Sequence, residues 1–317
     1  MGNKLDRIIE SIKDYNKISL FFHIYPDGDA LGSVFALREF IRHKYPHKIV
    51  NIIGLDSLEK KYLEKFIPSR LDKQPSDEWI KKSMGIICDT ANSDRVYTQK
   101  HLLCERTISI DHHPNSEEYA FLCWNDKNYS SCCEMIGEIL FYWNKKYISN
   151  VVAQYIYFGI VTDTNRFFYS NTLSSTFTLV SKLYKVMDNP TPILQKLNER
   201  SLNDIKFEEY IYSLINFNTK KHVASLLIPK LMFKKYKVEA SSMIWTMANV
   251  KDINIWTSLY YDTTTRVWKC SIRSKKIDVR PVAQMFNGGG HKNACGLILK
   301  SETEFTNVIS ELEKISL

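Results

Sequence analysis

Acidic and imidazole side chains follow several strand-like apolar runs that lie far apart in the chain. The residues with this placement are His23, Asp27, Asp29, Asp89, Asp111, His112, His113 and Asp163. Parallel α/β sheets bring residues at the carboxyl ends of their strands together, even when those residues are remote in sequence. Carboxylate oxygens and imidazole nitrogens without thiolates suit divalent first-row metals, and manganese more than structural zinc. The pattern therefore predicts a metal centre.

Two metal ions at such a centre could hydrolyse a phosphate ester. Ions about 3.5–4 Å apart lower the pKa of a bound water and stabilise the charge that develops on the phosphorus oxygens and on the leaving group. One ligand must then bridge both ions. Taken alone, each segment has a simpler interpretation, because Pro26-Asp27-Gly28-Asp29 consists of turn-forming residues and a single aspartate is often a helix cap. Only the combination indicates a site.

The elements that must position these residues follow the order of βαβ units. Strands are predicted over 18–24, 48–53, 84–88 and 107–110, and helices over 1–14, 30–41, 132–147, 151–161 and 171–187. A connection is predicted to begin at Asp188-Asn-Pro190-Thr-Pro192 and to continue as a helical stretch to about 217. Strands over 222–228, 255–261, 266–272 and 295–299, with helices over 280–286 and 303–315, predict a second, smaller α/β domain.

Length and composition agree with a folded two-domain protein. A chain of 317 residues exceeds the usual size of a single core, and 44% hydrophobic residues exclude a disordered chain. The net charge of +8 favours polyanionic partners. Seven cysteines without a Cys-x-x-Cys pair fit reduced packing residues in a cytoplasmic protein, and no apolar run is long enough for a membrane span.

Five segments, in order, resemble those of DHH-family phosphoesterases that carry a DHH-associated carboxyl-terminal domain. They are His23-x-x-Pro-Asp27-Gly-Asp29, Asp89-Thr-Ala-x-x-x-Arg95, Asp111-His112-His113-Pro-Asn115, Gly159-Ile-Val-Thr-Asp163 and Gly288-Gly-Gly-His291-x-x-Ala294-x-Gly296. The resemblance spans nearly the whole chain. It implies an α/β fold with a parallel-sheet DHH domain over 1–187, a linker and connecting helix over 188–217 and a smaller α/β substrate-binding domain over 218–317. The active site is expected in the cleft between the domains.

The resemblance also implies a role for each site residue. The implied ligands are His23 and Asp27 for one Mn²⁺, Asp29, His112 and Asp163 for the other, and Asp89 for both. Asp111 is implied to orient a histidine, as metal-bound imidazoles generally require. His113 is implied to contact the scissile phosphate or to protonate the leaving group. The implied substrate-binding residues are Arg273, Gly288, Gly289, Gly290 and His291.

Two of these segments allow a further expectation from the residues themselves. Three successive glycines at 288–290 expose backbone N–H groups, which could form an anion-binding nest, although a glycine run is more often a flexible loop. After Asp163-Thr164 the family commonly has glycine, whereas this chain has Asn165. Asparagine tolerates left-handed backbone better than other residues with a Cβ, so we expect the turn to survive.

The resemblance is closest to the branch of nanoRNases and phosphatases of 3′-phosphoadenosine 5′-phosphate (pAp). The predicted function is therefore hydrolysis of very short oligonucleotides to 5′-mononucleotides by an exonuclease that also acts on pAp. A phosphodiesterase for c-di-AMP or pApA is an open alternative. A noncatalytic nucleic-acid-binding protein is a second one, with bases stacked on aromatic residues such as Trp245, Trp256, Tyr260 and Trp268. The sequence does not decide between a monomer and a homodimer.

Overall fold

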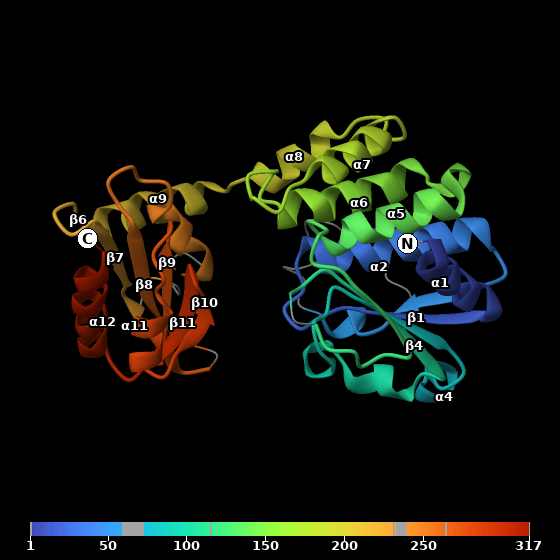
Figure 1. Cartoon of the computed structure of the whole chain (residues 1–317), viewed down its shortest axis with the longest axis horizontal. Coiled ribbons are helices and arrows are strands. Elements are labelled where there is room, and N and C mark those ends of the chain that lie inside the picture. The colour runs from blue at the N-terminus through green and yellow to red at the C-terminus, as the bar shows by residue number, and fades with distance from the viewer. Residues whose placement is uncertain are drawn as a thin grey trace. The chain divides into compact units, whose positions relative to one another are not determined.

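The chain forms two compact units, Met1–Asn198 (unit 1) and Glu199–Leu317 (unit 2) (Figure 1). The computed structural model describes residues 2–58, 73–114, 116–230, 232, 240–263 and 265–316. Asn115, the last residue of the Asp111 segment, lies outside them. The division between the units falls within the segment 188–217 that the sequence assigns to the connection. Helix α8 (Thr191–Asn198) packs on the core of unit 1 through Ile193, Leu194 and Leu197.

Unit 1 is built on a five-stranded sheet in which all neighbouring strands are parallel. The strands lie in the order β2-β1-β3-β4-β5. Their bounds are β1 Lys17–Phe21, β2 Ile49–Ile52, β3 Met84–Cys88, β4 Arg106–Asp111 and β5 Leu122–Asn125. The central strand β3 is buried over its whole length, as expected for a parallel strand that is covered on both faces. The predicted parallel α/β sheet is confirmed.

Helices cover both faces of this sheet. Within the described residues, the helices of unit 1 before α8 are α1 Gly2–Asp14, α2 Gly28–Lys44, α4 Asp77–Ile80, α5 Cys132–Asn144, α6 Asn150–Asp163 and α7 Ser174–Tyr184. Short 3₁₀ segments are η1 Leu55–Ser57, η2 Ser93–Arg95, η3 Gln99–Leu103 and η4 Lys145–Tyr147. Helices α2, α5 and α6 gather on one face and form the main core, while α4 contributes Ile80 to a smaller cluster on the other (Figure 1).

Unit 2 contains a six-stranded mixed sheet with the order β10-β11-β9-β8-β7-β6. The strands are β6 Asn216–Asn218, β7 Val223–Ile228, β8 Ile255–Asp262, β9 Val267–Ser274, β10 Gly289–His291 and β11 Ala294–Leu299. Only the β7–β8 pair is parallel among the described pairings. One face carries α11 (Arg280–Met285) and α12 (Glu302–Ile315), and the other packs on α9 (Leu202–Leu214) and the 3₁₀ segment η5 (Ala240–Met247).

Some predicted elements differ from those observed, for local reasons. The single helical stretch to about 217 is wrong: Ser201 and Asp204 form a capping box that starts α9 as a separate helix, with Ser201 Oγ accepting from Asp204 N at 3.1 Å. Helix α7 begins at Ser174, with Leu173 as its N-cap residue, and not at 171 as predicted. The strands β5, β6 and β10 were not predicted. Each has only three or four residues, and such a run is too short to show a period.

Candidate metal centre

Three neighbouring parallel strands end at one edge of the sheet and supply most of the site. His23 lies two residues after β1, and Asp89 directly follows β3. Asp111 is the last residue of β4, with His112 and His113 immediately after it. Because β1, β3 and β4 are adjacent in the sheet, residues from all three meet at their carboxyl ends.

Two helix ends supply the remaining carboxylates. Asp27 is the N-cap residue of α2, and its Oδ1 accepts hydrogen bonds from Asp29 N at 3.0 Å and from Ala30 N at 3.1 Å. Asp29 itself lies in the first turn of α2 and is fully buried. Asp163 is the last residue of α6, where a carboxylate faces the partial negative charge of the helix C terminus. A nearby cation would offset that repulsion.

The donor atoms of these residues form overlapping groups in which all atoms lie within 4.8 Å of one another. The groups are His23, Asp27 and Asp89; Asp29, His112 and Asp163; and Asp89, His112 and His113. The structure thus brings together all six residues that the sequence implies as ligands. Asp89 belongs to two of the three groups, and its Oδ1 lies 3.5 Å from His112 Nε2, which belongs to the third.

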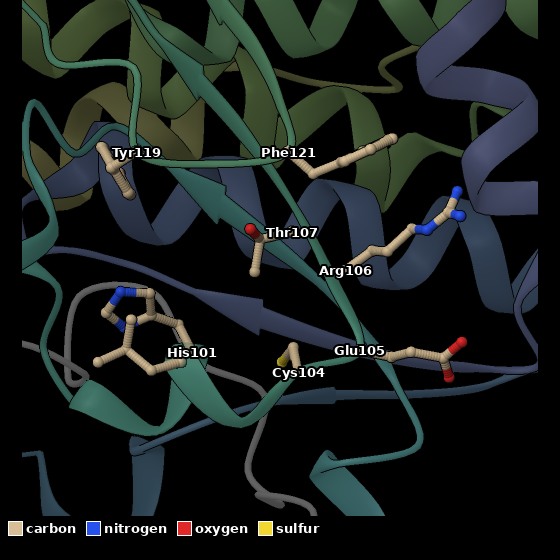
Figure 2. Close-up of a pocket in the computed structure, with 8 residues that line it drawn as sticks. His101, Cys104, Glu105, Arg106, Thr107, Tyr119 and Phe121 are labelled. Atoms are coloured by element: carbon tan, nitrogen blue, oxygen red, sulfur yellow. The ribbon is translucent and has the colours of Figure 1, made fainter.

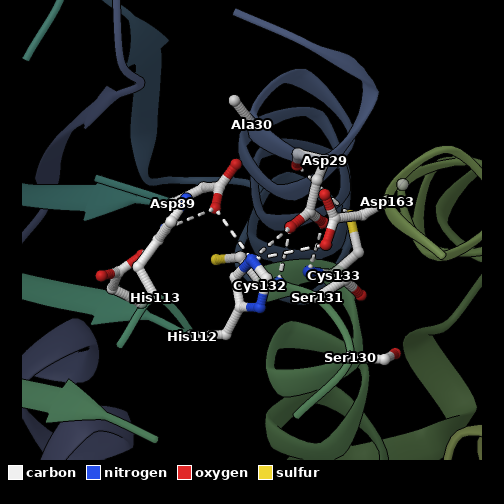
Figure 3. Close-up of polar contacts among 12 residues, drawn as sticks. Asp29, Ala30, Asp89, His112, His113, Ser130, Ser131, Cys132, Cys133 and Asp163 are labelled. Carbon is white, nitrogen blue, oxygen red and sulfur yellow. Dashed lines mark hydrogen bonds and ion pairs between the residues drawn. The ribbon is translucent and has the colours of Figure 1, made fainter. Parts of the chain in front are cut away.

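The two oxygens of Asp89 face different histidines. Asp89 Oδ2 lies 3.4 Å from His23 Nε2, and Asp89 Oδ1 lies 3.5 Å from His112 Nε2. His112 Nε2 is also 3.5 Å from Asp163 Oδ2 and 3.8 Å from Asp29 Oδ2 (Figure 3). His23 Nδ1 lies 2.7 Å from Ile24 O, which leaves Nε2 for the centre. Carboxylates therefore surround both imidazoles.

The donor set suits divalent cations. The side chain of Asp89 is 2% exposed, and its Oδ1 makes only long contacts among the described residues, with His112 Nε2 and His113 Nδ1 each 3.5 Å away. A buried carboxylate oxygen without a close partner is costly unless a cation neutralises it. Asp89 also has a φ of 54°, a left-handed conformation that is uncommon for residues with a Cβ and that recurs at functional sites. The chemistry of the donors suits first-row metals.

Without a metal, protons on the histidines balance the carboxylates. Burial lowers the pKa of His23, but its hydrogen bonds with Asp27 and Asp89 outweigh this effect and raise it to about 11. Burial also lowers the pKa of His112, but the interaction with Asp89 and the charges of the nearby carboxylates raise it by more, to about 10. Burial raises the pKa of Asp163 to about 6. The site thus holds protons at positions where a metal would bind.

Asp111 holds His113 beside the cluster. Its Oδ1 lies 2.8 Å from His113 Nδ1, and its Oδ2 accepts a hydrogen bond from Ser116 Oγ. The hydrogen bond to Asp111 raises the pKa of His113. The side chain of His113 is 44% exposed, so the ring remains accessible to a substrate.

Comparison with known proteins identifies the family. The family model "DHH family, N-terminal domain" matches residues 17–160, and the DHHA1 domain matches residues 220–316. The uncharacterized protein MG371 of Mycoplasma genitalium is 35% identical over 96% of this chain and 93% of its own length. The bifunctional oligoribonuclease and PAP phosphatase NrnA of Bacillus subtilis is 31% identical over 97% of both chains. The chain belongs to the DHH family.

A solved structure shares the fold of this chain. The crystal structure of an exopolyphosphatase-related protein from Bacteroides fragilis matches with a TM-score of 0.83 at 23% identity, covering 99% of this chain and 96% of that one. The family and the presence of both domains were predicted correctly, and family membership makes the chain a hydrolase of the DHH phosphoesterase type.

In the described residues, no helix combines the length and apolar character needed to cross a membrane.

The remaining predicted residues lie in the DHHA1 domain. Arg273 on β9 pairs with Ala294 on β11, which in turn pairs with His291 on β10. Side chains in such a row share one face of the sheet. Arg273 Nη1 also donates to Ile272 O at 2.9 Å and to Cys295 O at 3.2 Å, which fixes its guanidinium.

The glycine run forms a short strand at the edge of the sheet and not a flexible loop. Gly289–His291 forms β10, which pairs with β11, and the N–H of Gly288 donates to Ala283 O at 2.8 Å. Gly290 has a φ of 142°, and a Cβ there would lie 2.3 Å from Ala294 O. The close approach of the two strands therefore explains why this position is glycine. Anion binding by the glycine run stays a prediction.

The turn after Asp163 contains left-handed backbone. Asn165, Arg166 and Phe167 have φ values of 47°, 59° and 67°. The expectation that asparagine would accommodate this turn is confirmed. Phe167 packs against the core of unit 1, which anchors the turn next to the metal centre.

Two backbone N–H groups that hold Asp29 were not predicted from the sequence. Cys132 N donates to Asp29 Oδ2 at 2.6 Å, and Cys133 N donates to Asp29 Oδ1 at 2.7 Å (Figure 3). Both N–H groups belong to the first turn of α5. The signal that could have found them is Ser131-x-x-Glu134, a helix-start pattern with Glu three residues after the N-cap serine.

A separate cavity of about 340 Å³ lies at the opposite end of β4. Arg106 and Thr107, which line it, begin that strand, whereas Asp111 ends it (Figure 2). His101, also in the lining, is already paired, with Nε2 3.0 Å from Ser93 Oγ. This cavity is therefore not part of the metal centre.

Proposed function

We propose that the chain is a Mn²⁺-dependent phosphoesterase that hydrolyses short oligonucleotides to 5′-mononucleotides and also dephosphorylates pAp. The observation that carries the proposal is the presence of two donor groups, one of His23, Asp27 and Asp89 and one of Asp29, His112 and Asp163, which meet where Asp89 Oδ1 lies 3.5 Å from His112 Nε2. The similarity to NrnA, whose name describes an oligoribonuclease and PAP phosphatase, supports the substrate class. Digestion from the 5′ end is our expectation for oligonucleotides.

In this proposal His23 and Asp27 hold one ion, Asp29, His112 and Asp163 hold the other, and Asp89 bridges them. The ions would supply a water of lowered pKa and positive charge for the phosphate oxygens. Asp111 fixes His113 through Nδ1, with the two atoms 2.8 Å apart. The other nitrogen, Nε2, is then available to contact the scissile phosphate or to protonate the leaving oxygen.

The DHHA1 domain is proposed to bind the substrate at a distance from the reacting phosphate. Arg273 and His291 lie in one row across β9, β11 and β10 and share a face. A guanidinium and an imidazole on one face suit a phosphate group. If these residues hold the far end of the substrate while the ions hold the scissile phosphate, only a short substrate makes both sets of contacts at once, which favours about two to five nucleotides over long chains.

The two alternatives differ in how they fit the described residues. A c-di-AMP or pApA phosphodiesterase would use the same metal centre and is separated only by substrate tests. A noncatalytic binder would need exposed aromatic residues, but Trp256 is 6% exposed and Trp268 is 7% exposed, and both pack in the cores of unit 2. Trp245 is 49% exposed. Burial of two of these aromatics weighs against the binder.

A substrate panel tests the proposal. The full chain would be incubated with pAp, pApA, c-di-AMP and 5′-labelled RNA and DNA of 2 to 24 nucleotides, in Mn²⁺ and in chelator. We expect Mn²⁺-dependent release of 5′-mononucleotides, fastest per end for the shortest chains. Equal turnover per end of a dinucleotide and a 24-mer would contradict the length preference, and preferential cleavage of c-di-AMP would favour the alternative.

Substitution of the shared ligand provides a second test. Asp89→Ala is expected to lower kcat by at least about 100-fold and to weaken both ions, because losing a ligand from a metal site removes the cations that stabilise the transition state. Asp94→Ala, at an exposed aspartate in η2, is the matched control and should retain activity. Circular dichroism would check that both variants fold. An active Asp89→Ala enzyme would refute the two-metal proposal.

A further inference from the structure

The carboxylate of Asp29 is held by a helix from a distant part of the chain. Both of its oxygens accept backbone N–H groups from the first turn of α5, at 2.6 Å from Cys132 and at 2.7 Å from Cys133. Asp29 is fully buried, so water cannot replace these bonds. The direction in which Asp29 presents its remaining lone pairs to His112, 3.8 Å away, therefore depends on where the first turn of α5 lies.

The start of α5 is fixed from both sides of the helix terminus. Ser131 is the N-cap residue, and its Oγ accepts from Glu134 N at 3.0 Å. The side chain of Glu134 turns back toward the preceding segment. Its Oε2 accepts from Ser130 N at 2.9 Å and from Ser130 Oγ at 2.6 Å. Glu134 thus closes the turn that leads into the helix.

The same oxygen also ties this turn to α7. Thr176 Oγ1 donates to Glu134 Oε2 at 2.9 Å, and Asn171 Nδ2 donates to Ser130 O at 3.2 Å. Ser130, Glu134 and Thr176 are all 0% exposed. One carboxylate oxygen therefore joins three segments: the loop before α5, α5 itself and α7.

Burying the carboxylate of Glu134 costs more free energy than is needed to stabilise a helix start. A buried carboxylate costs free energy unless it is fully paired, and Glu134 Oε1 has no hydrogen-bond partner among the described residues. An exposed capping box would provide the same helix signal without burial. The arrangement of Glu134 makes physical sense where the exact position of the α5 terminus matters, and the group at that terminus is Asp29.

We propose that Glu134 is a positioning residue of the metal centre. Its carboxylate fixes the first turn of α5, and the N–H groups of that turn orient Asp29 toward the ion that it shares with His112 and Asp163. The inference rests on the proposed function insofar as Asp29 is a metal ligand. Glu134 lies 105 positions from Asp29 in the sequence. The contacts described above show that it acts on Asp29 through the backbone N–H groups of α5.

Two substitutions separate positioning from general stability. Glu134→Ala removes all three hydrogen bonds, and we expect it to weaken one of the two Mn²⁺ ions by about 10–100-fold, the usual effect of losing support for a ligand. Glu134→Gln keeps an acceptor at the position of Oε2 and places its NH₂ group at the position of Oε1. Because Oε1 has no described partner to lose, this variant should bind both ions within about threefold of the wild-type affinity.

Mn²⁺ affinity would be measured directly, by electron paramagnetic resonance of free Mn²⁺ during titration of the full chain. Ser19→Ala is the control, because it removes a buried 2.7 Å contact with Ser83 Oγ at the other end of the sheet. It should lower thermal stability without changing Mn²⁺ affinity. If Glu134→Ala does not fold, Thr176→Val removes one of the three bonds with little change of shape and should weaken one ion by about 3–10-fold.

The outcomes are distinguishable. Wild-type Mn²⁺ affinity in the folded Glu134→Ala variant, or in Thr176→Val, would overturn the positioning role. An equal loss of affinity in Ser19→Ala would also overturn it, since general destabilisation would then explain the effect. A wild-type protein that binds two ions but cleaves none of the proposed substrates would refute the proposed function and leave this inference standing. A wild-type protein that binds no Mn²⁺ would refute both.

Discussion

Protons and metal ions compete for the same nitrogen atoms in the centre. The pKa values of His23 and His112 are about 11 and about 10, so both imidazoles are protonated at pH 8 in the absence of metal. An imidazole must be neutral to bind a metal. Binding of two ions at pH 8 is therefore expected to release about two protons, and the affinity of each ion should rise by about tenfold per pH unit up to about pH 10.

Isothermal titration calorimetry in two buffers of different ionisation enthalpy would count these protons. Below about pH 6 the carboxyl of Asp163 also becomes protonated, which should make the loss of affinity steeper. In the metal-free protein the raised histidine pKa values stabilise the fold below pH 6.5, and this contribution is lost as the pH rises through about 10 to 11. Binding without proton release would contradict the charge balance described for the centre.

The side chains of this centre could be predicted from the sequence, but the groups that orient them could not. The pattern predicts His23, Asp89 and Asp111 as site residues because each follows an apolar strand-like run. The N–H groups that hold Asp29 are not, since every residue except proline carries one and the sequence does not say which will point at a carboxylate. Glu134 lies in a helix-start pattern, but only the fold places Thr176 beside it.

Helices α2, α5 and α6 approach closely around Asp29, and glycine makes this possible. A Cβ on Gly159 of α6 would lie 2.1 Å from Cys133 Sγ and 3.0 Å from Asp29 Oδ1. Gly159→Ala is expected to destabilise the protein, because overpacking costs about 1–3 kcal/mol and outweighs the gain of about 1 kcal/mol in helix propensity. Urea denaturation of the metal-free protein would measure the loss.

A double-mutant cycle would show whether the helix contact causes this loss. Cys133→Ala removes the sulfur that the new methyl group meets first, so the pair of substitutions should cost about 1 kcal/mol less than the sum of the two single changes. Strictly additive effects would mean that the strain arises elsewhere. In that case the close approach of α5 and α6 would not explain the glycine.

Elements with a long, buried pattern could be predicted, and short or edge elements could not. Strand β3 is apolar and buried throughout, and the sequence places its bounds correctly at 84–88. Strand β5 has four residues at the edge of the sheet, where burial alternates and the pattern is brief. Strand β10 consists of Gly-Gly-His, which has no strand propensity, and it exists because β11 supplies its hydrogen-bond partners.

At the scale of the whole molecule, the chain separates metal chemistry from the residues proposed to bind substrate. Every donor in the three metal-type groups lies between His23 and Asp163, inside unit 1. Arg273 and His291 lie in unit 2. The sequence could predict two domains from length and from the change of pattern near Pro190, but it contains no period or motif that fixes where one core ends.

This separation predicts how metal removal affects each unit. A ligand that binds only the native state stabilises it by RT ln(1 + [L]/Kd), which is about 2.7 kcal/mol, or about 100-fold in an opening equilibrium, at 100 times Kd. The stabilisation reaches only those amides whose exchange requires opening of the unit that holds the ion. Mn²⁺ should therefore slow hydrogen exchange by up to about 100-fold in β1, β3 and β4, and leave β7, β8 and β9 nearly unchanged.

Hydrogen exchange followed by mass spectrometry of the full chain, with Mn²⁺ or with chelator, would check this. Asp89→Ala is the control, since loss of the shared ligand should abolish the protection. Equal protection in both units would mean that they open together and that the division at Asn198 is not a boundary of cooperative unfolding. Protection confined to unit 2 would place the metal away from the histidine and aspartate cluster, because an ion protects the unit that binds it.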